Sequence, residues 1–547
     1  MPCVGYSQFD LFLPVWTPGS YLVREYSRHL EAISVATGAR IEKTRKNRWR
    51  VFLDQAQDEI RLRYSLYCHE LSVRTNWVSE DFALIVGAAT FIAPEHQLDR
   101  GFAVKLDLPT GWSGPWSGMP YEDGAWRAAD YDELLDSPIV GGIGSEVKFN
   151  FKGRTHLFVS AGDTTFWDLP KATADLELLI AEHANFWGDL PYQSYTFLNL
   201  ITSGRGALEH RNSMVTMADR LTMRSRESYL HWLELVSHEF FHVWNVKRLR
   251  PIELGPFDYE NEVYTRSLWI AEGFTEYYGL LLVRRAKLCS DDEFLGGLSE
   301  IIRKVQTAPG RLRQPVAQAS FDAWIKLYRP DENSINSSIS YYTKGALIGW
   351  LLDARIRSAT ADHVSLDDAM RLAYHRHGDK TGYSTDDFLS IVEEVAGEDV
   401  RHWLTSAVEQ AGELDYQPGL DHFSLRFKGS GEPAKSHVGI TVKVEAGRLT
   451  VKESWQAGLS AGDEILGLNG YRVLPERWAS VVERHHVGET VRLLIARDEK
   501  FREIEVTLTV DQRNDWHLER VGQPQEGGYE SWVAPSVSSG TLQQSCL

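Results

Sequence analysis

The chain has 547 residues, more than one hydrophobic core usually organises, so three or four domains are expected. Hydrophobic residues make up 43% and charged residues 24%, which is typical of a globular protein and argues against a disordered chain. The net charge of −18 argues against binding to nucleic acid or to an anionic membrane, because both need clustered Lys and Arg side chains.

The cysteines and the hydropathy of the chain argue against further classes of protein. Cys3, Cys68, Cys289 and Cys546 are far apart and form no CxxC pair, which argues against a disulfide framework and against a Cys-ligated zinc site. The longest apolar stretch, ALIVGAATFIA, is too short to span a membrane. The first residues lack the pattern of a signal peptide. We expect a cytoplasmic protein without a membrane span, or a periplasmic, exported one if a signal segment precedes this sequence.

The first part of the chain is β-rich. Short alternating runs such as RWRVFLD and EIRLRYSLY are separated by turn signals such as TPGS. We assign residues 1–160 to an N-terminal β domain.

Helical periodicity dominates the next 250 residues. KATADLELLIAEHANFW has helical spacing and is followed by a predicted strand at 195–202. A long helix is predicted over 226–249, ended by Pro251, and a second over 265–288. We assign residues 161–415 to a mainly α-helical domain.

A smaller β module follows a turn-rich linker. GITVKV and RLTVKE alternate as strands, and Asn469-Gly470 is a strong hairpin signal. We assign this module to residues 436–511. The polar composition of residues 512–547 predicts a disordered tail. The fold class is therefore multidomain α+β.

The stretch HEFFH contains the pattern of a metal site. His238 and His242 are four residues apart, so on a helix they differ by only about 40° around the axis and project side by side. Two imidazoles in this arrangement can bind one Zn²⁺. Glu239 points elsewhere and is placed to act as a general base on a water molecule. The alternative interpretation is a buried helix with two hydrogen-bonded histidines.

A third ligand is expected because catalytic zinc usually has three protein ligands and one open position. Glu272, thirty residues after His242, lies on the second predicted helix, which can return antiparallel to the first. Glu276 lies one turn further on the same face. It is a competing ligand, a group that orients a histidine, or a surface salt-bridge residue. The prediction is one Zn²⁺ per chain, bound by His238, His242 and Glu272.

Five stretches of the chain match one family pattern: HEFFHVWNVKRLRP, LWIAEGFTEYYG, VWTPGSYLVREYSRH, GALEH and YTKGALIGWLLD. Together they resemble the glycyl aminopeptidase family, zinc peptidases of the gluzincin clan that carry a PDZ domain and are related to aminopeptidase N. The family has further strands before WTPGSY, so we expect the first sheet to be incomplete.

The resemblance implies a thermolysin-like catalytic domain over residues 161–415 and roles for further residues. It implies that Tyr342 stabilises the oxyanion and that Glu209 pairs with the substrate α-ammonium group, within a substrate-binding strand that contains Gly206 and Ala207. The alternatives are a core tyrosine at 342 and an exposed loop glutamate at 209. A preference for N-terminal Gly or Ala is likewise implied by the resemblance alone.

The C-terminal module resembles a PDZ domain of the bacterial type. Val438, Gly439 and Ile440 lie where such domains bind a C-terminal carboxylate. A structural β module without this function is the alternative.

These features predict a zinc aminopeptidase that acts on peptides with a free N-terminus. The alternatives are a zinc endopeptidase whose substrates are selected by the PDZ-like module, and an inactive peptide-binding scaffold. Peptide substrates, and a C-terminal peptide at the PDZ-like module, are the expected partners.

Overall fold

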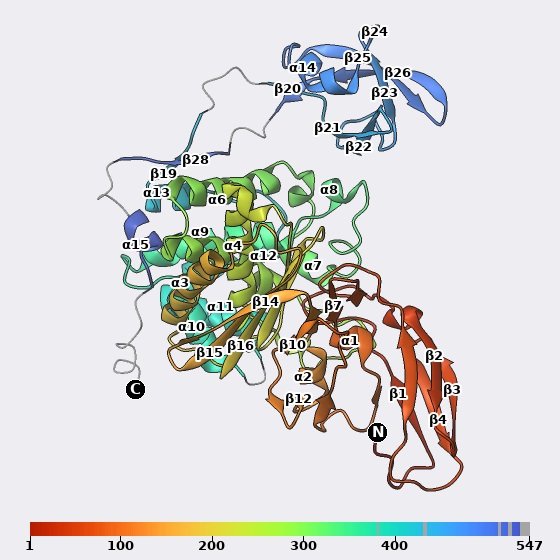
Figure 1. Ribbon diagram of the computed structural model, residues 1–547. Helices are drawn as coiled ribbons and strands as arrows, with labels where there is room; N and C mark the ends of the chain where they lie inside the picture. The colour runs from red at the N-terminus through yellow and green to blue at the C-terminus, as the bar shows by residue number, and fades with distance from the viewer. Residues whose placement is uncertain (380–381, 430–434, 512–515, 523–527, 537–547) are drawn as a thin grey trace.

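The computed structural model describes residues 1–547 except 380–381, 430–434, 512–515, 523–527 and 537–547. It has an N-terminal β-rich region, a central helical region and a C-terminal region of β sheets (Figure 1). This is the multidomain α+β architecture that the sequence predicts. Among the described residues, no helix is both long enough and apolar enough to cross a membrane.

The N-terminal region is built from short antiparallel strands, as the alternating runs predict. One sheet has the order β3-β4-β1-β8, with β3 at Ala39–Arg45, β4 at Arg48–Leu53, β1 at Gln8–Phe12 and β8 at Ala93–Pro94. In β4 the buried side chains Trp49 and Val51 alternate with more exposed ones, because successive side chains of a strand point to opposite faces. The predicted strand RWRVFLD is confirmed as β4.

A five-stranded sheet supports the central region. Its order is β14-β15-β16-β18-β17, with β14 at Gly144–Phe151, β15 at Arg154–Gly162, β16 at Ser194–Ile201, β18 at Ser213–Ala218 and β17 at Gly206–Glu209. The predicted boundary near residue 160 therefore falls inside the β14–β15 hairpin, whose strands pair with the central sheet. β17 is an edge strand, antiparallel to β18, and its other edge is unpaired within this sheet.

Two helices pack beside this sheet. Helix α3 (Leu169–Trp187) matches its prediction, whereas α4 spans Arg226–Phe241 and ends eight residues earlier than predicted. His242 is the C-cap, and the chain leaves the helical path at Val246, whose φ is 119°. The side chain of Asn245 explains this ending: its Nδ2 donates to the carbonyl oxygens of Ile270 and Ala271 rather than to its own helix.

The second predicted helix begins with a π-helical turn, η4 (Trp269–Phe274), and continues as α5 (Thr275–Arg285). Such turns widen the helix locally and are frequent at functional sites. The turn packs tightly against helix α9 (Tyr341–Ala359) through two glycines, because a Cβ atom at Gly273 would lie 2.6 Å from the Cα atom of Gly345. These glycines let the two helices approach each other.

The C-terminal module contains the predicted strands. Its main sheet has the order β21-β22-β23-β25-β26, in which β25 is Thr490–Arg497 and β26 is Lys500–Thr507. Strand β21 (Ile440–Glu445) forms a hairpin with β22 (Arg448–Ser454). The Asn469-Gly470 turn joins β23 (Glu464–Leu468) to the short β24 (Tyr471–Arg472), as predicted. A 3₁₀ turn at Pro475–Arg477 and the five-residue helix α14 (Trp478–Val482) follow β24.

The prediction of disorder over residues 512–547 is wrong for the parts that the structure describes. Strand β28 (Leu518–Arg520) pairs with β19 (Leu425–Phe427), and helix α15 (Tyr529–Val533) lies against the central region (Figure 1). The polar tail contains aromatic residues that pack against distant parts of the chain, and Trp532 is fully buried. Residues 512–515, 523–527 and 537–547 lie outside the described part of the chain.

Candidate metal centre

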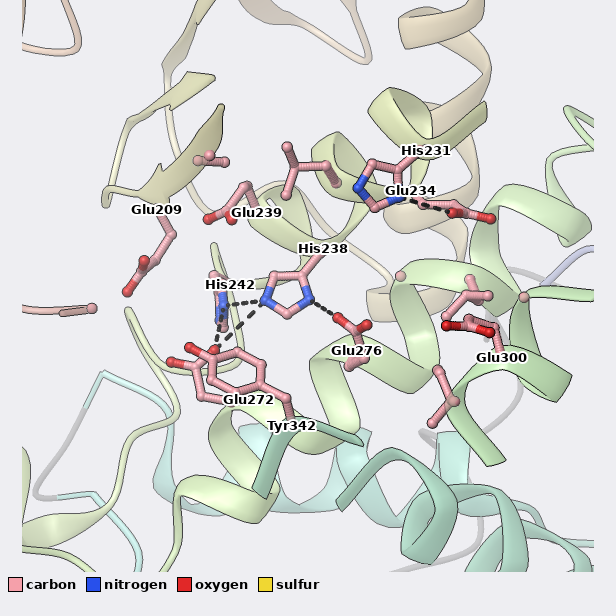
Figure 2. A pocket seen from close by; sticks show the side chains of 18 of the residues that line it. Glu209, His231, Glu234, His238, Glu239, His242, Glu272, Glu276, Glu300 and Tyr342 are labelled. Atoms are coloured by element: carbon pink, nitrogen blue, oxygen red, sulfur yellow. Dashed lines mark hydrogen bonds and ion pairs between the residues drawn. The ribbon is translucent and has the colours of Figure 1, made fainter. Parts of the chain in front are cut away.

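A cleft of about 380 Å³ opens between β17, α4, α5, α6 (Asp291–Gln306) and the start of α9. Figure 2 shows the side chains that line it. The cleft brings together nine of the predicted site residues: His238, His242, Glu272, Glu239, Glu276, Tyr342, Gly206, Ala207 and Glu209.

Two imidazoles and one carboxylate converge inside the cleft. The Nε2 atoms of His238 and His242 are 3.1 Å apart, because the last turn of α4 stacks the two residues on one face. Glu272 Oε2 lies 3.2 Å from His242 Nε2 and 3.6 Å from His238 Nε2 (Figure 2). All three side chains are buried. Two neutral imidazoles and a carboxylate are the donor set of many catalytic zinc sites, so these residues fit a divalent metal.

The electrostatics of Glu272 agree with this fit. Burial alone raises the pKa of its carboxyl, but the neighbouring His242 and His238 outweigh that effect and hold the pKa at about 2. The carboxylate is therefore ionised throughout the neutral range, as a metal ligand requires.

Glu276 does not join the converging group. Its Oε2 lies 3.0 Å from Nδ1 of His238, on the side of the ring opposite the group (Figure 2). Nδ1 of His242 lies 2.8 Å from the carbonyl oxygen of Asn245. Each imidazole thus has a partner on its outer nitrogen, which turns Nε2 towards the shared point and fixes the tautomer. Of the three interpretations of Glu276, the geometry favours the one in which it orients a histidine.

Replacing Glu276 by glutamine should weaken zinc binding about 10- to 100-fold, because His238 would lose the carboxylate that orients it and raises its basicity. Glu300→Gln is the matched control, since Glu300 lines the same cleft but pairs with Arg303. Competition titration with a chromogenic chelator measures both affinities. Equal affinities in the two variants would show that Glu276 does not support the ligand.

Glu239 lies beside the converging group on α4. Its side chain is buried, and its Oε2 has no hydrogen-bond partner among the described residues. Burial raises the pKa of this carboxyl to about 7, against the opposing effect of His238 and His242. A carboxyl with a pKa near neutrality is suited to accept and return a proton.

Glu209 ends the edge strand β17 and belongs to a second buried group with Glu239 and His242. It is only 3% exposed, so it is not the exposed loop glutamate of the alternative interpretation. Lys247 Nζ lies 3.8 Å from its Oε1. Gly206 and Ala207 precede it along the cleft.

Two residues from the N-terminal region reach this strand, and no sequence pattern predicts either contact. Gly19, with φ of 82°, packs so closely on Glu209 that a Cβ atom there would collide with its carboxylate. Arg74 donates from Nη2 to the carbonyl oxygen of Ala207, at 3.3 Å. The TPGS turn signals a glycine turn at residue 19, but no local pattern indicates which distant residue the turn meets.

Tyr342 lines the cleft from the first turn of α9, with its ring centroid 6.1 Å from that of His238. Burial, with the nearby Glu272, raises the pKa of its hydroxyl well above the usual value, so the group stays protonated and able to donate a hydrogen bond. Its neighbour Tyr341 is fully buried and is a core residue.

The three residues predicted for a PDZ peptide loop lie in the C-terminal module and are not part of the lining of this cleft. Val438 and Ile440 are buried in the core of that module. The backbone N–H of Gly439 donates to His437 Nδ1, at 2.8 Å. Peptide binding at this loop stays a prediction.

The chain was compared with family models, with curated proteins and with solved structures. Residues 1–143 match the Peptidase M61 N-terminal domain, and residues 231–348 match M61 glycyl aminopeptidase. A search of curated proteins found no match. A crystal structure of an aminopeptidase N family protein from Idiomarina loihiensis is 28% identical, with a TM-score of 0.91 over 98% of this chain and 96% of that one.

A more distant similarity is to an M1 zinc metallopeptidase from Deinococcus radiodurans, which is 14% identical with a TM-score of 0.46 over 75% of this chain and 88% of that one. The two family matches cover both the N-terminal strands and the segment that contains His238, His242 and Glu272. This chain belongs to the M61 glycyl aminopeptidase family of metallopeptidases.

Proposed function

We propose that this protein is a zinc-dependent aminopeptidase that removes the N-terminal residue, preferably Gly or Ala, from peptides. The observation that carries the proposal is the position of Glu209, a buried carboxylate at the end of an edge strand and beside the candidate metal group. Gly19 lines the same cleft and packs directly against the Glu209 carboxylate. A substrate whose α-ammonium group pairs with Glu209 has its first residue beside the candidate metal group, as removal of single N-terminal residues requires.

Zinc bound by His238, His242 and Glu272 would acidify a water molecule and polarise the scissile carbonyl group. Glu239 takes the proton from the attacking water and returns it to the leaving amine. Tyr342 donates its hydroxyl hydrogen to the oxygen that becomes negative in the tetrahedral intermediate. Glu209 pairs with the α-ammonium group of the substrate. The edge of β17 that is unpaired within its sheet hydrogen-bonds the substrate backbone as an added strand.

The test is turnover of glycyl and alanyl chromogenic amides by the purified protein, with and without a metal chelator. The proposal expects turnover that the chelator abolishes and that added zinc restores. Turnover that is unaffected by full removal of metal would contradict it. Cleavage only of long peptides with blocked N-termini would favour a zinc endopeptidase, and no cleavage of either substrate would favour a peptide-binding scaffold.

Replacing Glu209 by glutamine should lower kcat/KM for substrates with a free N-terminus by about 100-fold, because a buried charge pair with the ammonium group is lost. Cleavage of N-blocked peptides, if the wild type has any, should not fall. Glu234→Gln is the control. Glu234 lines the same cleft, but it lies on α4 and not on the edge strand β17 that carries Glu209. Normal turnover of glycyl amides by Glu209→Gln would show that Glu209 does not bind the amine.

A further inference from the structure

A second cavity, of about 530 Å³, is lined by the start of the edge strand and adjoins the metal cleft. The two share Gly206, His231 and Leu235 as lining residues. Gly206 stands at the boundary and has no side chain to close it. No role in the chemistry proposed above uses this second cavity.

The edge strand relates the two cavities to the direction of a bound peptide. β17 runs from Gly206, at the second cavity, to Glu209, at the candidate metal group. Three residue steps along a strand span about 10 Å. A peptide that pairs antiparallel with β17, with its first residue opposite Leu208 and its amine reaching the Glu209 carboxylate, places its third residue opposite Gly206. Helix α4 runs beside it, with His231 and Leu235 one turn apart on the side of the second cavity.

The lining of the second cavity includes four large apolar side chains. Met217, Leu221 and Trp232 contribute to it, together with Leu235. Three charged residues also line the cavity. Asp219 accepts a hydrogen bond from the backbone N–H of Leu221, Arg224 lies over the ring of Phe166, and Arg205 directly precedes Gly206. The apolar side chains of the lining favour a hydrocarbon side chain.

We propose that this cavity binds the side chain of the third residue of a peptide substrate and selects an apolar residue there. The inference rests on the proposed aminopeptidase function and specifies its substrate class: peptides of at least three residues, with an apolar third residue. Single-residue amides do not reach the cavity.

The test compares kcat/KM for the tripeptides Gly-Ala-Leu, Gly-Ala-Gly and Gly-Ala-Asp. We expect the leucine peptide to exceed the other two by about 10- to 100-fold, the range that one apolar side chain in a fitting pocket supplies. A ratio near one, or a preference for aspartate, would overturn the inference.

A cavity-filling variant tests whether the preference for a third-residue leucine arises in this cavity. Ser228 is exposed on the first turns of α4 and lines the cavity, so Ser228→Trp should fill it and bring the leucine-to-glycine ratio close to one. Glu227→Trp adds the same side chain one position away, outside the cavity lining, and should keep the wild-type ratio. Because each ratio is measured within one variant, a change in the amount of folded protein cancels. An unchanged ratio in Ser228→Trp would overturn the inference.

Turnover of the glycyl chromogenic amide tests the proposed aminopeptidase function independently of the preference at the third residue. Wild-type turnover of the amide without discrimination among the tripeptides rejects the subsite and leaves the aminopeptidase function intact. No turnover of the amide or of any tripeptide rejects both.

Discussion

Replacing Glu239 by glutamine should lower kcat for a glycyl chromogenic amide by about 10³-fold while the protein still binds zinc. General acid–base catalysis by one positioned side chain contributes about 10²- to 10⁴-fold. Glutamine has nearly the same size and sits at the same place on α4, but it cannot accept and return a proton. Glu239 is buried beside the metal group and is not one of its converging ligands, so the zinc content should not change.

Steady-state kinetics together with metal analysis of the same sample measure both quantities. Glu227→Gln, at an exposed position of the same helix, is the control and should keep wild-type kcat and zinc content. A Glu239→Gln variant with more than about a tenth of wild-type kcat would show that another group transfers the proton. Loss of zinc from this variant would show that Glu239 is a ligand instead.

Replacing Trp532 by alanine should lower the free energy of unfolding of the central region by about 3–5 kcal/mol, the usual cost of removing a large buried aromatic side chain. Trp532 is fully buried, and its ring stacks on that of Phe423 at 4.1 Å between centroids. Its Nε1 donates to the hydroxyl of Tyr277, which itself donates to Asp353. Arg285 Nε donates to the carbonyl oxygen of Trp532.

Chemical denaturation measures this effect. Trp532→Phe separates the two contributions, because it keeps the stacked ring and removes the N–H donor, and should cost about 1–2 kcal/mol. A loss below about 1 kcal/mol in Trp532→Ala would mean that α15 is not docked on the central region in solution. Since Tyr277 and Arg285 belong to α5, which begins directly after η4 and its Glu272, a docked tail also supports the helix behind the metal group.

The core of the candidate site follows from local sequence. A helix places residues four apart on one face, so HEFFH predicts two adjacent imidazoles without knowledge of the rest of the fold. The distance of thirty residues to Glu272 allows a returning helix. The choice between Glu272 and Glu276 does not follow from sequence, because both lie on one face. It depends on which ring nitrogen each carboxylate meets, and therefore on the π-helical turn that sets the rotation of Glu272.

Contacts between distant segments could not be read from local patterns. Gly19 and Arg74 reach β17 from the N-terminal region, and their roles depend on how two regions of the chain pack. Helix α4 ends at Phe241 because Asn245 bonds to a different segment, while the helical periodicity of the sequence continues to residue 249. The polar composition of the tail predicts disorder and does not indicate that Trp532 is buried. That burial depends on a site formed by α5 and Phe423.

The most direct test of the central claim is a crystal structure of the zinc-loaded protein, with anomalous diffraction at the zinc edge to identify and locate the ion. The account predicts one zinc per chain, about 2.1 Å from Nε2 of both His238 and His242 and from a Glu272 carboxylate oxygen, with an open position on the side of Glu239. A zinc ion bound elsewhere, or one at the two histidines with the Glu272 carboxylate beyond bonding distance and no other acid in its place, would contradict it.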